Sequence, residues 1–552
     1  MDIIVTIITT VCRFIMPPCA LALVVMCAMN LLKKRKNNFE CYAVFKGKRK
    51  FAIKNAETFV GSASLSDMRI KGADAHHAMI RAGADGCVIS ALNGSVVTVN
   101  GNEVDTACVS DADIIGIADT EFRICSGRDI YSSKQSIQSH GVFNISIPFL
   151  MLFIYQIALF VSSSFNSAES ISKTAACYGA FMLAELIYFI AVKFREDSEI
   201  EMLAAFMIST GFAVSAGIGF STLLKQEISF FIGFAGAIII YFILRNMKLV
   251  NALRIPAAAI GIALFAVNVV FAKTRNGAQN WLSIGSMSFQ PSELIKVILV
   301  FVCASGLNVM LTKRNTFAFV TFSVVSMACL AVIRDFGTLT VYFLVLILVL
   351  FMRMCSLKLI LAIISSAAVC AVGVVVAFPY VAKRLFSFGH AWQNASGSGF
   401  QQTRTLISSA SGGLLGLGPG KGLLRKISAA TTDMVFGVVT EELGLIVSIC
   451  SIACFAIFSI YTARRLSKTR CFYYGVTACA TSMIFITQAS LNVFGSLDML
   501  PFTGVTLPFI SCGGSSIMVC TMLLAFIKAS RMDSDDTDEI DFNYDDEFEV
   551  ES

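Results

Sequence analysis

A polar stretch between two long apolar segments reads Asn276-Gly-Ala-Gln-Asn-Trp-Leu-Ser-Ile-Gly-Ser-Met-Ser-Phe-Gln-Pro-Ser-Glu-Leu-Ile-Lys296. It starts as a polar turn and ends inside a hydrophobic segment, which carries Glu293 and Lys296 one helical turn apart. Side chains at this spacing share a helix face and can form an ion pair. Charges inside a membrane segment are costly and usually functional. The pair is therefore either a structural ion pair or the wall of a polar cavity that holds a charged head group.

Apolar segments dominate the rest of the chain. Of its 552 residues, 56% are hydrophobic and only 14% are charged, which is more apolar surface than a soluble domain can bury. Runs of about 20 apolar residues, long enough to cross the hydrocarbon core as helices, recur along most of the length. The predicted fold is a polytopic all-α membrane protein.

Cysteine usage and charge exclude several other classes of protein. Most of the 18 cysteines lie inside apolar runs, as Cys303 and Cys450 do, where a thiol behaves as a small hydrophobic group. No CxxC pair and no His/Cys cluster has the spacing of a metal site. The net charge of +6 comes mainly from short loops, which is typical of membrane topology. We therefore expect no structural metal and no nucleic-acid partner.

The N-terminal part of the chain changes composition twice. Residues 1–36 form an apolar segment that ends in a basic cluster, Lys33-Lys-Arg-Lys36. Because the basic residues follow the apolar run, an uncleaved anchor is favoured over a signal peptide. Residues 40–128 contain short runs separated by Gly, Asp and Asn turns, which is typical of a small β-sandwich. A polar linker, residues 129–141, follows.

The C-terminal part of the chain contains twelve further apolar spans. Two of them fall in residues 142–199 and ten in a core at residues 200–531, and an acidic tail at residues 532–552 is predicted to be disordered. The spans begin near Phe143, Thr174, Met202, Phe230, Leu253, Pro291, Phe317, Leu339, Leu357, Met434, Phe472 and Gly504.

Alternating crossings separate basic loops from polar, glycine-rich loops. The basic loops all fall on the side of the Lys33–Lys36 cluster, which the positive-inside rule makes cytoplasmic. The β-sandwich and the acidic tail are then cytoplasmic as well. Residues 273–290, 379–432 and 492–503 lie together on the outer face.

The longest outer loop carries further candidates. It holds Gly399-Phe-Gln-Gln-Thr-Arg404, a glycine-rich run from Ser411 to Gly420, and Thr431-Thr-Asp433 directly before a helix. Long structured loops in compact proteins are usually functional. Asp433 either caps the following helix or acts as a catalytic base, and spacing alone does not separate the two roles.

Five ordered motifs between Met202 and Ser530 resemble the SEDS family of bacterial cell-wall proteins, represented by FtsW, RodA and SpoVE. The motifs are Gly277-Ala-Gln-Asn-Trp281 with Gln290-Pro-Ser-Glu-Leu-Ile-Lys296, Asp335-Phe-Gly-Thr338, Ser411-Gly-Gly413 with Gly416, Thr432-Asp-Met-Val-Phe436 with Glu441-Glu-Leu-Gly444, and Leu500-Pro-Phe-Thr-Gly-Val-Thr-Leu-Pro-Phe-Ile-Ser-Cys-Gly-Gly-Ser-Ser516. The resemblance implies a ten-helix core, preceded here by three extra helices, in the bacterial cytoplasmic membrane.

The resemblance also implies an activity. Members polymerise lipid II into glycan strands outside the membrane, usually with a class B penicillin-binding protein as the transpeptidase. Asp433 is implied to deprotonate the acceptor hydroxyl, while Lys296, Arg404 or a divalent cation (Mg or Mn) would balance the leaving diphosphate. Implied substrate-binding residues are Glu293, Lys296, Arg404, Gln401, Ser411, Gln290 and Ser515.

The chain departs from the family pattern at three positions. Asn280 replaces the usual basic residue before the tryptophan, Arg334 replaces a proline, and Arg404 stands where glutamine is frequent. None of these departures removes Asp433 or the Glu293–Lys296 pair. Activity is therefore expected, and two alternatives stay open: a lipid II flippase or transporter, and a noncatalytic scaffold of a cell-wall complex. Division, elongation and sporulation all use the same core.

The soluble module resembles a forkhead-associated (FHA) domain. Gly61, His77-Ala78, Asn93-Gly94 and Asn100-Gly101 are in register with that pattern. Members that read phosphothreonine carry an arginine and a Ser-Arg pair, where this chain has Ser62 and Asp74-Ala75. Loss of the guanidinium and gain of a carboxylate oppose phosphate binding. A degenerate module that docks other division or elongation proteins is expected.

Overall fold

The computed structural model describes residues 2–32, 41–45, 50–53, 57–62, 66, 68–74, 77–83, 86–92, 95–110, 113–126, 140–166, 171–191, 198–275, 278–284, 287–305, 313–354, 357–377, 382, 384–385, 388–466 and 472–531. Contacts between Cα atoms divide the chain into a large helical unit and a smaller unit around residues 33–139. Most of the predicted linker and the acidic tail, residues 127–139 and 532–552, lie outside the described residues.

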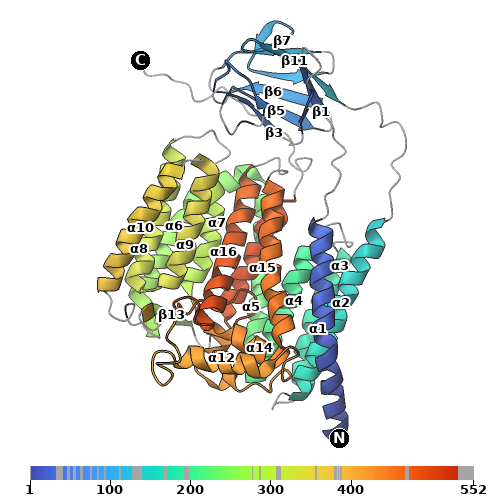
Figure 1. Cartoon of the computed structure of the whole chain (residues 1–552), viewed down its shortest axis with the longest axis vertical. Helices are drawn as coiled ribbons and strands as arrows, with labels where there is room; N and C mark the ends of the chain where they lie inside the picture. Colours follow the sequence, from blue (N-terminus) through green and yellow to red (C-terminus); the bar gives the residue numbers. More distant parts are fainter. Residues whose placement is uncertain are drawn as a thin grey trace. The chain divides into compact units, whose positions relative to one another are not determined.

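The smaller unit is a sandwich of two β-sheets (Figure 1), as predicted. One sheet has the strand order β2-β1-β11-β10-β7-β8 and the other has β4-β3-β5-β6-β9. Buried side chains of both sheets, among them Val60, Ile80, Ile115 and Phe122, form one hydrophobic cluster. The strands are β1 Cys41–Phe45, β2 Lys50–Ile53, β3 Glu57–Gly61, β4 Met68–Arg69, β5 Ala78–Gly83, β6 Gly86–Ala91, β7 Val97–Val99, β8 Asn102–Val104, β9 Thr106–Val109, β10 Ile114–Ile117 and β11 Thr120–Ser126.

His77 joins two loops of this sandwich. Its ring is buried, accepts a hydrogen bond at Nδ1 from the backbone N–H of Asp74 (3.2 Å), and places Nε2 2.9 Å from the carbonyl oxygen of Val96. Ser95 Oγ donates to Asp74 Oδ2 at 2.8 Å, yet the Asp74 side chain stays 70% exposed. An exposed carboxylate at this position would repel a phosphate group, in line with the sequence argument.

Three helices precede the core of the larger unit. They are α1 Asp2–Leu32, α2 His140–Asn166 and α3 Ile171–Ala191. Gln156 Nε2 on α2 donates to Glu185 Oε2 on α3 (2.7 Å) and to Ser209 Oγ on the first core helix (2.9 Å). Tyr155 and Thr210 make a further buried hydrogen bond of 2.9 Å. Interhelical hydrogen bonds of this kind hold membrane helices together, so the extra helices are attached to the core by polar contacts.

The core follows as ten long helices in the described part of the chain, which confirms the predicted fold. Every residue of α4 from Met202 to Ala216 is buried, so this helix lies inside the bundle. The helices are α4 Glu199–Ile218, α5 Phe220–Leu244, α6 Met247–Phe271, α7 Pro291–Ser305, α8 Lys313–Ile333, α9 Phe336–Met354, α10 Leu357–Ala377, α15 Leu445–Leu466, α16 Phe472–Ser496 and α17 Gly514–Ala529.

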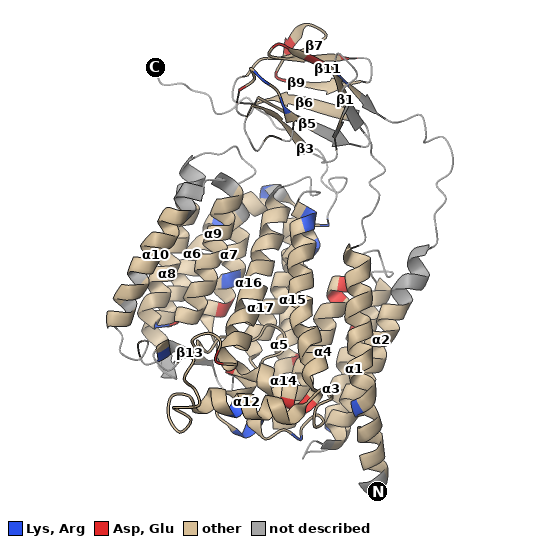
Figure 2. Cartoon of the chain, viewed as in Figure 1, with Lys and Arg blue, Asp and Glu red and all other residues tan. Residues whose placement is uncertain are grey.

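Eight helices within the described residues are long and apolar enough to cross a membrane: α1 to α6, α15 and α16. Shorter apolar helices lie within α8, α9, α10 and α17. In Figure 2 charged residues of the bundle lie mainly near helix ends, beside α7, and around the short helices α12 Phe400–Gly412 and α14 Val435–Leu443, while most of the remaining helical surface is uncharged. The protein is a multi-pass membrane protein.

The predicted start of α5 was wrong by ten residues. The sequence placed the start of this span near Phe230, but the helix begins at Phe220 and includes the polar residues in between. Gln226 is buried inside the bundle, accepts from Ser215 Oγ (2.7 Å) and donates to the carbonyl of Ser511 (3.1 Å). A polar residue whose hydrogen bonds are satisfied within the protein is tolerated in a membrane helix.

Two other predicted spans, unlike α5, begin later than expected. The span placed at Met434 starts at Leu445, because Gly444 (φ 90°) ends a separate short helix before it. The span placed at Gly504 starts at Gly514, because residues 497–513 form an irregular segment that packs against the outer loop. Hydropathy does not register either break, since the residues on both sides are apolar.

Candidate active site

A small sheet joins α6 to α7. Its strands are β12 Lys273–Arg275, β13 Ala278–Ile284 and β14 Met287–Phe289, antiparallel and in that order. The sequence predicted only a polar turn here, and Asn276 and Gly277 of that turn lie outside the described residues. Pro291 then occupies the first turn of α7, where its missing N–H costs nothing.

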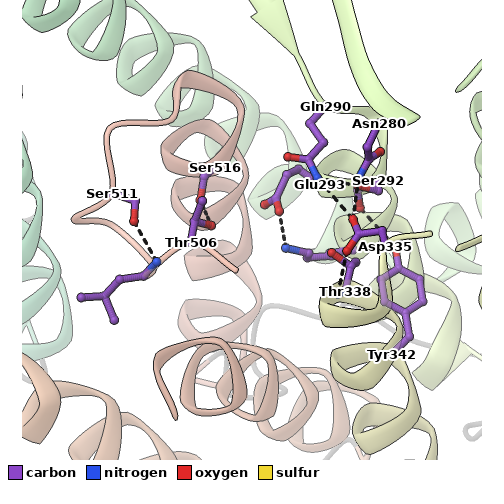
Figure 3. A network of polar contacts seen from close by, with 12 residues as sticks. Asn280, Gln290, Ser292, Glu293, Asp335, Thr338, Tyr342, Thr506, Ser511 and Ser516 are labelled. Carbon is purple, nitrogen blue, oxygen red and sulfur yellow. Dashed lines mark hydrogen bonds and ion pairs between the residues drawn. The ribbon is translucent and has the colours of Figure 1, made fainter. Parts of the chain in front are cut away.

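A buried polar network lies beneath this sheet (Figure 3). Asn280 Nδ2 donates to Ser292 Oγ (2.9 Å) and to Asp335 Oδ2, and its Oδ1 accepts from Asn268 Nδ2 (2.8 Å). Gln290 Nε2 donates to Ser292 Oγ (3.2 Å) and to Asp335 Oδ2 (3.4 Å). Asn280, one of the predicted departures from the family pattern, therefore has a structural role in this chain. Gln290, a predicted substrate contact, points into the same network.

Asp335 connects that network to α9. Its Oδ1 accepts the backbone N–H of Thr338 at 3.0 Å, which caps the first turn of the helix. Burial raises the pKa of Asp335 above its ordinary value, and the hydrogen bonds from Thr338 partly offset this. The preceding residue, Arg334, has φ 66°. A proline is locked near φ −65°, so a proline at this position could not adopt this backbone conformation.

Glu293 and Lys296 form the ion pair that their spacing predicted. Lys296 Nζ lies 2.6 Å from Glu293 Oε1, and the two side chains are only 1% and 5% exposed, in that order. Glu293 Oε2 has no hydrogen-bond partner among the described residues. The helix that carries the pair, α7, packs against α16 and α17. The pair therefore lies inside the bundle, at the outer end of α7 next to the sheet.

Three short helices of the long outer loop follow: α12 Phe400–Gly412, α13 Ala430–Asp433 and α14 Val435–Leu443. Two adjacent carboxylates on α14, Glu441 and Glu442, bind the backbone of the loop between α12 and α13. The donors are the N–H groups of Leu423 and Leu424 to Glu441 (3.0 and 2.9 Å) and of Gly420 and Gly422 to Glu442 (2.8 and 3.2 Å). Burial raises the pKa of Glu442 to about 7.

The glycine-rich run allows close contact with α14. Gly416 has φ 76°, and a Cβ there would lie 2.3 Å from the carbonyl oxygen of Glu442, so only glycine fits. The sequence identified the glycines and the Glu441-Glu442 motif but not their contact. The sequence signal that could have predicted this contact is a pair of acidic residues after a glycine-rich run, because the N–H groups of a buried loop need acceptors.

Asp433 is the last residue of α13, a helix that begins after Ala429 in a left-handed conformation (φ 61°). It does not occupy the N-cap position of α14, which is Met434, so the capping role considered from the sequence is wrong. The Asp433 side chain is half-buried. Gly504 (φ 72°) is adjacent, since a Cβ there would lie 3.3 Å from Asp433 Oδ2.

The Leu500–Ser516 motif packs against α13 and fixes its position. Ser511 Oγ donates to the carbonyl of Thr432 (2.6 Å), and the backbone N–H of Cys512 donates to that of Thr431 (2.9 Å). Asn492 Nδ2 on α16 donates to the backbone oxygen of Asp433 (2.9 Å) and of Val505 (2.8 Å). Two segments that are far apart in sequence thus meet at Asp433, and the sequence placed both of them on the same side of the membrane.

The remaining predicted substrate residues are spread over the outer loop and α17. Gln401 Nε2 donates to the carbonyl of Ser428 (3.3 Å), close to α13. Arg404 is exposed on α12, with its guanidinium carbon 5.3 Å from the centre of the Phe400 ring. Ser411 is exposed and donates to the carbonyl of Ser408 (2.7 Å) at the end of α12. Ser515 is buried in the first turn of α17.

No group of three or more His, Cys, Asp or Glu side chains in the described part of the chain is arranged to hold a metal ion. The acidic residues of the outer loop instead accept backbone hydrogen bonds, as Glu441 and Glu442 do. A divalent cation could bind there only if a substrate supplied most of its oxygen ligands.

The helical core of this chain is similar in sequence to known proteins. The sequence profile of the FtsW/RodA/SpoVE family, described as "Cell cycle protein", matches residues 198–534. A relative from Buchnera aphidicola subsp. Schizaphis graminum, named "Probable peptidoglycan glycosyltransferase FtsW", is 30% identical over 311 residues, which are 52% of this chain and 88% of that protein. Another from Tolumonas auensis carries the same name and is 32% identical over 284 residues, covering 50% of this chain and 73% of that one.

Among solved structures, the rod shape determining protein RodA of Thermus thermophilus is 20% identical to this chain, with a TM-score of 0.44. The match covers 61% of this chain and 98% of the RodA chain. The family profile spans more than half of the chain and includes α4 to α17 with the outer loop that carries Asp433. This chain belongs to the FtsW/RodA/SpoVE family of cell cycle proteins.

Proposed function

We propose that the protein is a peptidoglycan glycosyltransferase that polymerises lipid II at the outer face of the bacterial cytoplasmic membrane. The observation that carries the proposal is the position of Asp433, half-buried where α13 meets the segment before α17. Its backbone is fixed by Asn492, while the side chain lies beside Gly504. A carboxylate on a fixed backbone, in a loop on the predicted outer face, suits a general base.

The proposed step is a displacement at the anomeric carbon of the donor sugar. Asp433 accepts the proton of the acceptor hydroxyl, whose oxygen forms the new bond to that carbon. The bond from the carbon to the diphosphate oxygen breaks, and its electron pair leaves with undecaprenyl diphosphate. Attack from the side opposite the leaving group inverts the configuration at this carbon.

Positive charge must balance the leaving diphosphate. Lys296 is almost fully buried and paired with Glu293, so much of its charge is already compensated. Arg404 is exposed on α12 and could form two parallel hydrogen bonds to a phosphate. We therefore assign the diphosphate contact to Arg404 and a positioning role to the pair. A divalent cation bound through the diphosphate remains part of the proposal.

The proposed orientation places the Lys33–Lys36 cluster, the β-sandwich and the acidic tail in the cytoplasm. Asp433 and the sheet before α7 then face outward, where peptidoglycan is assembled. A class B penicillin-binding protein is the proposed transpeptidase partner. The FHA-like β-sandwich is proposed to dock other division or elongation proteins, and the exposed Asp74 carboxylate argues against a phosphothreonine ligand.

Purified protein with its transpeptidase and lipid II tests the activity. We expect glycan polymer from the wild type and none from Asp433→Ala. Asp498→Asn is the matched control, because Asp498 is an acid of the same outer face whose carboxylate accepts the backbone N–H groups of Gly389 and Ala391. Lipid II crossing vesicle membranes without polymer would instead favour a transporter, and polymer made only by the partner would favour a scaffold.

A further inference from the structure

A cavity of about 270 Å³ lies between the extra helix α3 and the core helices α4, α5 and α17. Its walls are apolar and largely aromatic. Six phenylalanines contribute: Phe181, Phe189, Phe230, Phe231, Phe234 and Phe242. The lining residues lie in the second half of α3, most of the second half of α5 and of α17, and the first half of α4, and none of them belongs to the loop that carries Asp433. An apolar ligand would fit this lining.

One end of the cavity carries charge. Lys528 lines it, with Nζ 3.6 Å from Glu201 Oε1 and 4.7 Å from the centre of the Tyr188 ring. Arg531 Nη1 lies 3.2 Å from Glu201 Oε2. Within the described residues, two cations therefore share the Glu201 carboxylate, which leaves a positive charge in excess there. Tyr188 and Tyr241 stand at the same end, where tyrosines typically mark the boundary between hydrocarbon and head groups.

Glu185 is the other acidic residue in the cavity wall. Its Oε2 accepts the amide N–H of Gln156 at 2.7 Å, so this carboxyl belongs to the α2–α3–α4 contact described above. The carboxylate that pairs with Lys528 in the described part of the chain is that of Glu201 instead.

We propose that this cavity binds one acyl chain of an anionic phospholipid, whose phosphate contacts Lys528. The apolar walls match a hydrocarbon chain, the excess charge matches an anionic head group, and the tyrosines place the junction at the membrane boundary. Because α3 forms one wall, the lipid bridges the extra helices and the catalytic core. The inference does not depend on the proposed activity.

Native mass spectrometry of the purified full-length protein tests the proposal. After detergent exchange, the protein is titrated with phosphatidylglycerol and with phosphatidylcholine of the same acyl chains. We expect one tightly retained phosphatidylglycerol and weaker binding of phosphatidylcholine. Lys528→Gln should lower phosphatidylglycerol affinity about fivefold, since one basic residue near an anionic lipid contributes about 1 kcal/mol. Lys248→Gln is the control, because Lys248 does not line the cavity.

A second variant tests the cavity itself. Ala237 lines it on α5, whereas Ala235 on the same helix is exposed and does not. Ala237→Trp should abolish the retained lipid and Ala235→Trp should leave it in place. Equal affinity for both lipids in the wild type and in Lys528→Gln would overturn the proposal. Retention of lipid by Ala237→Trp, or preferential binding of undecaprenyl phosphate over phosphatidylglycerol, would overturn it as well.

Discussion

At the scale of single residues, Gly504 combines a left-handed backbone with contact to the proposed base. Gly504→Ala would strain φ 72° and place a methyl group 3.3 Å from Asp433 Oδ2. We expect about 1–2 kcal/mol of lost stability and a larger loss of polymerisation, because the carboxylate must move. Gly373→Ala is the control, since Gly373 lies in helix α10 and a Cβ added there would have no other atom within 4 Å. Wild-type activity in Gly504→Ala would contradict the proposed contact.

The buried ion pair makes a second prediction at this scale. Lys296→Met leaves the Glu293 carboxylate buried without its cation, which should cost about 3–5 kcal/mol. Adding Glu293→Gln removes the orphaned charge, so the double variant should be more stable than Lys296→Met alone. Thermal unfolding in detergent measures the stability of the two single variants and of the double variant. If the losses of stability from the two substitutions were additive, Glu293 and Lys296 would not stabilise each other, which would contradict the prediction.

At the scale of elements, the loop between α12 and α13 depends on carboxylates of α14. Burial raises the pKa of Glu442 from 4.5 in a model peptide to about 7. The folded state therefore binds more protons than the unfolded state between these values, so the contribution of Glu442 to stability is complete below pH 4.5 and is lost as pH rises to about 7. We expect Glu442→Gln to flatten this fall in a thermal unfolding series from pH 5 to 8. An unchanged slope would contradict the prediction.

Some contacts of helices and loops could be predicted from the sequence, and others could not. The Glu293–Lys296 pair was predictable because helical periodicity fixes which side chains meet. The Glu441 and Glu442 contacts were not, because their partners are backbone N–H groups of a distant loop. The helix break at Gly444 and the burial of Gln226 in α5 were not predicted either, for a related reason. Hydropathy reads local apolarity, and both features are decided by tertiary contacts.

At the scale of the whole molecule, the ten-helix core and its three added helices followed from the number of apolar spans, and the β-sandwich from its turn pattern. The meeting of two loops at Asp433 followed from topology, because alternating crossings place residues 379–432 and 492–503 on the same side of the membrane. The exclusion of a capping role for Asp433 did not, since it depends on the one-turn helix α13 ending at Asp433. That exclusion required the fold.

The polymerisation rate of Asp433→Asn tests the central claim most directly. The substitution keeps the size and planar shape of the side chain and removes only its basicity. With purified protein, its transpeptidase partner and lipid II, we predict a rate at least about 100-fold below wild type, together with an unchanged thermal unfolding temperature. Polymerisation by Asp433→Asn at the wild-type rate would contradict the assignment of Asp433 as the general base.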